Sequence, residues 1–90
     1  MTHIQQDESF VIGLVGKKMI IRTTGIILIG QITAVCILSN GKIVFYTTIP
    51  YLGGETIKSI QYGHLPNSEV VGWVIYTQTH RYDDFDIDIL

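Results

Sequence analysis

MIIRTTGIILIGQITAVC, residues 19–36, is the densest block of β-branched and aliphatic side chains in the chain. Such side chains favour a pleated surface that is at least half buried. The block predicts two strands, Lys18–Thr23 and Ile26–Leu38, joined by a tight turn at Thr23-Thr24-Gly25. The second strand is long for a small domain, so we expect it to bend, with Gly30 as the bending point.

Outward from this hairpin, the rest of the chain also alternates with the period of strands. Asn40-Gly41 lies between two apolar runs and favours a type I′ hairpin turn. Further strands are predicted at Lys42–Ile49, Thr56–Tyr62 and Glu69–Gln78, with loops at Tyr51–Glu55 and Gly63–Ser68 between them. The sequence therefore predicts one all-β domain over residues 1–90, a small and strongly bent barrel or sheet of five to six strands.

The two ends of the chain are less regular. Met1–Ser9 is polar, and Ser9 is a possible cap for a short segment at Phe10–Val15, which suits an edge strand or one helical turn because Gly13 disfavours a long helix. At the other end, residues 81–90 read RYDDFDIDIL. Their alternation of aspartates with apolar residues fits a last strand with one acidic face, or an extended acidic tail.

The composition narrows the possible partners. The chain is 47% hydrophobic and only 16% charged, so a monomer of 90 residues has difficulty hiding its apolar side chains. The longest apolar block, Ile26–Leu38, is too short for a membrane-spanning helix, and MTHIQQDES lacks the cations of a secretory signal. We therefore expect a cytoplasmic homo-oligomer with no membrane partner. A net charge of −2 argues against binding to duplex DNA.

Thr24–Ile32, TGIILIGQI, resembles the first motif of the Sm-like family, and of its bacterial Hfq branch in particular. The matching positions are Gly25, Leu28, Gly30, Ile32 and Val35. The resemblance implies a bent five-stranded barrel, rings of six or seven subunits, and binding of single-stranded RNA at loops around the pore. Where the motif has an aspartate after this strand, this chain has Cys36.

Catalytic and metal-binding patterns are weak in this sequence. Cys36 lies in an apolar strand, where we expect a buried thiol that behaves as a small hydrophobe. His80 with Asp83 and Asp84 is the nearest approach to a metal site, and solvated tail residues are the favoured interpretation. The sequence predicts a non-enzymatic protein without metal or cofactor.

The aromatic residues near predicted loops suggest a nucleotide-type ligand instead. A base would stack on Tyr51 or Trp73, as bases do on aromatic side chains in single-strand-binding proteins. Phosphate would be held by Arg22, Lys58 or Arg81. Neighbouring polar and aromatic groups complete the predicted ligand-binding set, namely Thr48, Tyr62 and His64.

Three functions remain open at this point. The first is binding of a nucleotide-type ligand by a homo-oligomer. That ligand is a short RNA, as in the Sm-like family, or a small cyclic nucleotide withheld from a host receptor, similar to the phage sponge proteins that blunt bacterial immunity. The alternative is a protein-binding accessory or inhibitor module that docks through its apolar strands and acidic tail. The third is a purely structural oligomer subunit.

Overall fold

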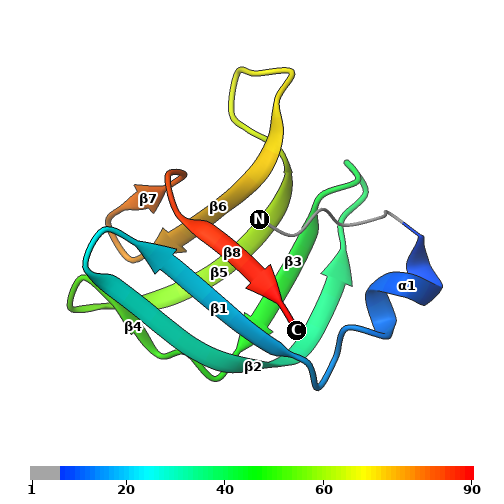
Figure 1. The fold of residues 1–90 in the computed structure, drawn as a ribbon. Coiled ribbons are helices and arrows are strands. Elements are labelled where there is room, and N and C mark those ends of the chain that lie inside the picture. The colour runs from blue at the N-terminus through cyan, green and yellow to red at the C-terminus, as the bar shows by residue number, and fades with distance from the viewer. Residues whose placement is uncertain (1–6) are drawn as a thin grey trace.

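A computed structural model describes residues 7–90 as a single antiparallel sheet that curls into a half-barrel (Figure 1). A short helix, α1 (Glu8–Ile12), precedes eight strands: β1 (Lys18–Thr23), β2 (Ile26–Ile37), β3 (Ile43–Thr47), β4 (Tyr51–Leu52), β5 (Glu55–His64), β6 (Val71–Thr77), β7 (Arg81–Tyr82) and β8 (Asp86–Ile89). The strand order is β7-β6-β5-β3-β2-β1-β8, and β4 pairs with β5. The expectations for residues 1–6 lie outside the described residues.

The predicted all-β class is confirmed, but the predicted count of five to six strands is wrong. Five strands have five or more residues and follow one another across the sheet: β1, β2, β3, β5 and β6. The other three have only two to four residues. A strand of two residues has no visible period in the sequence, which is why β4 and β7 were missed.

The β1–β2 hairpin forms where the sequence predicts it. Thr23 pairs with Ile26, and Gly25 has a φ of 77°, which a turn of this kind requires. β2 changes partner along its length: its residues pair with β1 as far as Gln31 and with β3 from Ile32 onward. Gly30, the predicted bending point, lies at this change of partner.

The Asn40 turn differs from the predicted type I′ turn. Leu38 donates from its N–H to the carbonyl of Lys42 at 2.8 Å and accepts from the N–H of Gly41 at 2.9 Å. Gly41 alone has a positive φ here, 86°, so the loop has three residues and ends in a glycine bulge. The Asn40 side chain accepts from the N–H of Lys42 at 3.0 Å, which favours this longer loop.

A two-residue turn occurs instead at Gly53-Gly54, within the predicted loop Tyr51–Glu55. Both glycines have positive φ, 60° and 81°. They join β4 to β5, and Leu52 pairs with Glu55 across the turn. The predicted loop is therefore a tight hairpin, which fixes the position of Glu55.

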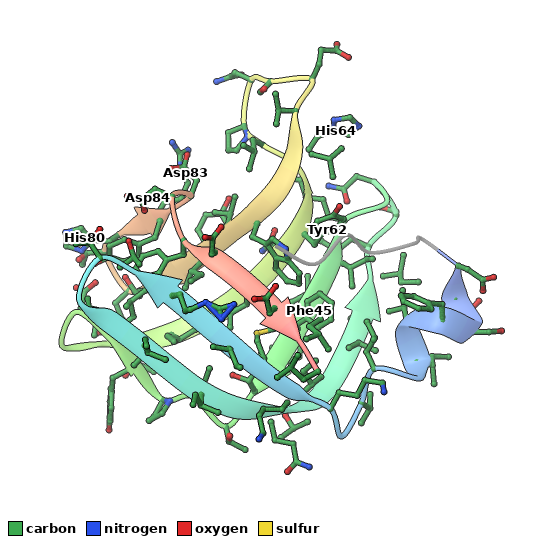
Figure 2. The ribbon with its side chains drawn as sticks, in the orientation of Figure 1. Phe45, Tyr62, His64, His80, Asp83 and Asp84 are labelled. Atoms are coloured by element: carbon green, nitrogen blue, oxygen red, sulfur yellow. The ribbon has the colours of Figure 1, made fainter. Side chains whose placement is uncertain are left out.

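The core fills the concave side of the curled sheet, where Figure 2 shows Phe45 and Tyr62. The Trp73 ring lies 5.2 Å from the Phe45 ring and 5.0 Å from the Tyr62 ring, centroid to centroid. Cys36 is exposed, so the prediction of a buried thiol is wrong. Its neighbour Val35 packs against the core, and consecutive residues of a strand point to opposite faces.

The N-cap of α1 lies two residues before the predicted cap, Ser9. Asp7, not Ser9, is the cap: its Oδ1 accepts from the N–H of Ser9 at 2.9 Å. The helix ends at Gly13, and Val11 is fully buried, which attaches α1 to the core. No helix among residues 7–90 has the length and apolar character needed to cross a membrane.

Candidate functional site

The predicted stacking residue Trp73 and its neighbour Tyr62 belong to the core. Trp73 is 2% exposed and Tyr62 is 4% exposed. Their rings contact each other and leave no free face for a base. Neither side chain is able to stack on a ligand without opening the core.

The predicted phosphate ligand Arg22 is held by the C-terminal strand. Its guanidinium forms an ion pair and hydrogen bond with the carboxylate of Asp88. β8 pairs with β1 over four residues, so the acidic end of the chain is an edge strand of the sheet. Among residues 7–90, the acidic end is therefore a paired strand and not a free tail, and Arg22 is already paired with a carboxylate.

The other exposed residues of the predicted set are spread over separate elements. Tyr51 is in β4, Lys58 is in the middle of β5, His64 ends β5 and Arg81 begins β7. Figure 2 shows His64 beside the tall β5–β6 hairpin, away from the β7 side where His80 lies. Of three hollows in the described chain, at α1 and β2, at β3 and β5, and at the bend of β2, none is lined by more than one of these residues.

Large apolar side chains are instead exposed on the convex side of the β1–β2 hairpin. On β1, Met19 and Ile21 are fully buried, so the alternate residues face outward. Ile27 is 66% exposed and Ile29 is 61% exposed. We call this surface the hairpin outer face; it consists of Lys18, Ile20, Arg22, Ile27, Ile29 and Gln31.

A hollow of about 370 Å³ adjoins the hairpin outer face at the bend of β2, and we call it the bend hollow. Thr48, one of the predicted ligand residues, lines it and accepts a hydrogen bond from the N–H of Gln31 at 3.0 Å. The Gln31 side chain donates to the carbonyl of Gly16 at 2.9 Å. Lys18 forms no ion pair with the described residues, so its ammonium is available to an anion. The lining is Gly16, Lys18, Ile29, Gly30, Gln31 and Thr48.

A second hollow of about 400 Å³ lies between α1 and the C-terminal half of β2, and we call it the α1–β2 groove. Its walls are apolar except for one carboxylate, and they consist of Glu8, Val11, Ile12, Val35 and Ile37. Ile12 is 58% exposed. The sequence predicted neither hollow. Both depend on whether a given face of a strand lies on the concave or the convex side of the curled sheet, and the sequence does not show this.

The carboxylate of Glu55 accepts hydrogen bonds from donors of the β6–β7 turn. Thr77 donates from its hydroxyl to Oε1 at 2.6 Å, and Thr79 donates to Oε2. His80 Nδ1 lies 3.0 Å from Oε1. These hydrogen bonds, with that of Thr77 foremost, lower the pKa of Glu55 to about 2.

We call Glu55, Thr77, Thr79 and His80 the Glu55 cluster. It contains a carboxylate, a histidine and a hydroxyl, as a catalytic triad does, but in a different arrangement. In a triad, the carboxylate and the hydroxyl bind opposite ring nitrogens of the histidine. Here Thr79 Oγ1, at 2.9 Å, and Glu55 Oε1, at 3.0 Å, both face Nδ1 of His80. The cluster therefore holds the turn in place. Residues 7–90 contain no group of three side chains arranged to hold a metal ion.

The Glu55 cluster predicts a specific pH dependence of stability. Because folding lowers the pKa of Glu55 from 4.5 to about 2, its stabilisation is complete above pH 4.5 and disappears as the pH falls through about 2. Glu55→Gln is expected to lower the melting temperature at neutral pH, and the difference from wild type should close over that pH range. Glu69→Gln, at an exposed carboxylate in the β5–β6 loop, is the control. An unchanging difference down to pH 2 would show that the charge of Glu55 is not involved.

Comparison of the chain with protein-family models, curated proteins and solved structures found no match. The resemblance of Thr24–Ile32 to the first Sm motif therefore stays a prediction. The described chain offers three surface features for binding: the hairpin outer face, the bend hollow and the α1–β2 groove.

Proposed function

We propose that this protein is a non-catalytic binding protein that works as an assembly of identical subunits. The observation that carries the proposal is the exposure of large apolar side chains on two separate surfaces, the hairpin outer face and the α1–β2 groove. Contiguous apolar surface on a soluble domain marks a site of interaction. Two such surfaces on one small chain allow one to join subunits and the other to bind a ligand.

The sheet topology is consistent with a ring or dimer of barrels. The five long strands form a consecutive antiparallel series, which is the strand number that the Sm-like resemblance implies. A small domain with a marginal core gains stability from subunit contacts. The Sm-like relationship is thus part of this proposal, and so is a ring of subunits.

Native mass spectrometry of the protein purified from the cell that makes it tests the proposal directly. We expect a mass that is a whole multiple of 10.1 kDa, with the mass of any retained ligand added to it. A mass of one chain at concentrations well above those in the cell would overturn the proposed assembly.

The bend hollow is the best place for a nucleotide-type ligand. Its volume of about 370 Å³ suits a small ligand, Ile29 offers an apolar wall, and Lys18, which forms no ion pair with the described residues, offers a cation for phosphate. This site replaces the predicted one at Tyr51 and Trp73, and retains Thr48 from it. The competing ligand is a protein partner docked on Ile27 and Ile29, whose flat apolar face has a charged rim typical of protein interfaces.

A panel of mononucleotides, cyclic nucleotides and short oligoribonucleotides distinguishes these ligands by thermal shift. A ligand at 100 times its Kd should stabilise the fold by about 2.7 kcal/mol. Lys18→Ala should remove that shift, whereas Lys58→Ala, at an exposed lysine on β5, should keep it. Absence of a shift for every compound would leave the hairpin outer face as a protein-docking surface only.

A further inference from the structure

The C-terminal half of β2 has one edge that no strand covers in the part of the chain that the structure describes. Leu38 bonds through both its N–H and its C=O to the β3 side of the hairpin. Because these directions alternate along a strand, the N–H and C=O groups of Val35 and Ile37 point to the opposite edge. β1, the neighbour on that side, pairs with β2 as far as Gln31, and the preceding Gly16 and Lys17 bond to the C=O and N–H of Ile32. The backbone groups of Val35 and Ile37 therefore face an open edge.

The α1–β2 groove runs beside this open edge. Figure 1 shows α1 next to the C-terminal end of β2, at the rim of the curled sheet. Val11 anchors the helix in the core, while Ile12 and Ile37 remain exposed across a space of about 400 Å³. A groove of this kind, with an open strand edge on one side and apolar side chains on the other, suits an added extended strand.

The open β2 edge and the β8 edge differ in how they are protected. Exposed edges are usually blunted by charges, prolines or covering segments. The β8 edge carries Asp86 and Asp88 on its outward face, which disfavours pairing with another strand. The Val35–Ile37 edge has neither a proline nor a charged residue. The β2 edge therefore lacks the charges that protect the β8 edge against pairing.

We propose that β2 of a second copy pairs antiparallel along this edge and forms the subunit contact of the proposed assembly, on which this inference rests. The edge is complementary to itself: with the two-fold axis at Cys36, each Val35 faces Ile37 of the other copy, so the open backbone groups of both residues are paired. The same pairing brings together the exposed apolar side chains of both grooves, Ile12 and Ile37. An isologous contact of this type closes on itself as a dimer, so a ring of subunits needs a second contact between such dimers.

Two substitutions test this contact without disturbing the β2–β3 ladder. Ile37→Pro removes an N–H that points away from β3, and proline is tolerated at such edge positions. Ile12→Lys places a charge in the groove from an exposed position on α1. Both are expected to weaken self-association about tenfold or more in light scattering coupled to size exclusion. Val70→Lys, at an equally exposed apolar residue in the β5–β6 loop, should assemble as the wild type does.

Amide hydrogen exchange of the wild-type protein gives an independent readout. Exchange at Val35 and Ile37 should be about tenfold or more slower in concentrated than in dilute solution, while Cys36, which bonds to β3, should not change. An assembled protein in which both variants and both amides are unaffected would overturn this contact but leave the assembly standing. A wild-type monomer would overturn both, and protected amides in a monomer would show that another segment of the same chain covers the edge.

Discussion

Gly30→Ala is expected to lower the free energy of unfolding by about 3 kcal/mol, because the bend of β2 has no room for a side chain. A Cβ at this position would lie 2.4 Å from Cγ1 of Ile49, 2.9 Å from Oγ1 of Thr48 and 3.1 Å from the backbone N of Ile49. The Thr48 N–H also donates to the carbonyl of Gln31 at 3.0 Å, so the backbone after β3 is tied to the bend and cannot withdraw freely.

The melting temperature reports this effect. For a domain of this size, 3 kcal/mol corresponds to a decrease of about 12–24 °C. Gly72→Ala is the matched control, because an added Cβ there would meet only Leu65, at 3.5–3.6 Å, which is ordinary van der Waals contact. Equal melting temperatures for the two variants would contradict the close approach of the Ile49 segment to Gly30.

The hairpin at the centre of the fold could be predicted because its signals are local. The isoleucine-rich runs, the glycine of the turn at Gly25 and the glycine of the bend at Gly30 all lie within one stretch of sequence. The bend, the β1–β2 pairing and the all-β class follow from them. The strands β4 and β7 were not predictable in this way, since each is defined by a partner strand and not by its own pattern.

The position of the hairpin outer face could not be predicted from the pattern of a single strand. Alternation predicts that Ile27 and Ile29 share a face, but not whether that face is concave or convex. Both faces of β2 are rich in isoleucine, so the sequence does not show which of them is buried. The curl of the sheet buries the side of Met19 and Ile21 and leaves Ile27 and Ile29 exposed.

Aromatic residues misled the site prediction for the same reason. Tyr62 adjoins a predicted loop and Trp73 lies in the next predicted strand, but the two pair across β5 and β6 and point into the curl. Arg22 was predicted to hold a phosphate, whereas it bonds to Asp88, 66 positions away in the chain. Contacts between such distant residues follow from the strand order, which sequence periodicity does not define.

Trp73→Ala is expected to have the largest effect of any single truncation, about 3–5 kcal/mol, as is typical for loss of a buried aromatic residue. This is a large part of the stability of a small domain. The reason is the loss of ring contacts to Phe45 and Tyr62, whose centroids lie 5.2 and 5.0 Å from that of Trp73. Trp73→Phe should recover part of the loss, because a smaller ring keeps some of these contacts.

Tyr51→Ala separates the structural role of Trp73 from a ligand-binding role. Tyr51 is 61% exposed, so its truncation should change the unfolding free energy by less than about 0.5 kcal/mol. If a base stacks on Tyr51, the same substitution should weaken its binding by about 1–3 kcal/mol without a change in stability.

Fluorescence of the wild-type protein gives the decisive readout for Trp73, because it is the only tryptophan in the chain. A ring that is 2% exposed should emit at short wavelength and resist quenching by iodide until the protein unfolds in urea. Ready quenching of the folded protein would place Trp73 at the surface and restore it as a stacking residue. Protection together with a large loss of stability in Trp73→Ala leaves the outer side of the barrel, and not its aromatic core, as the surface that meets a ligand.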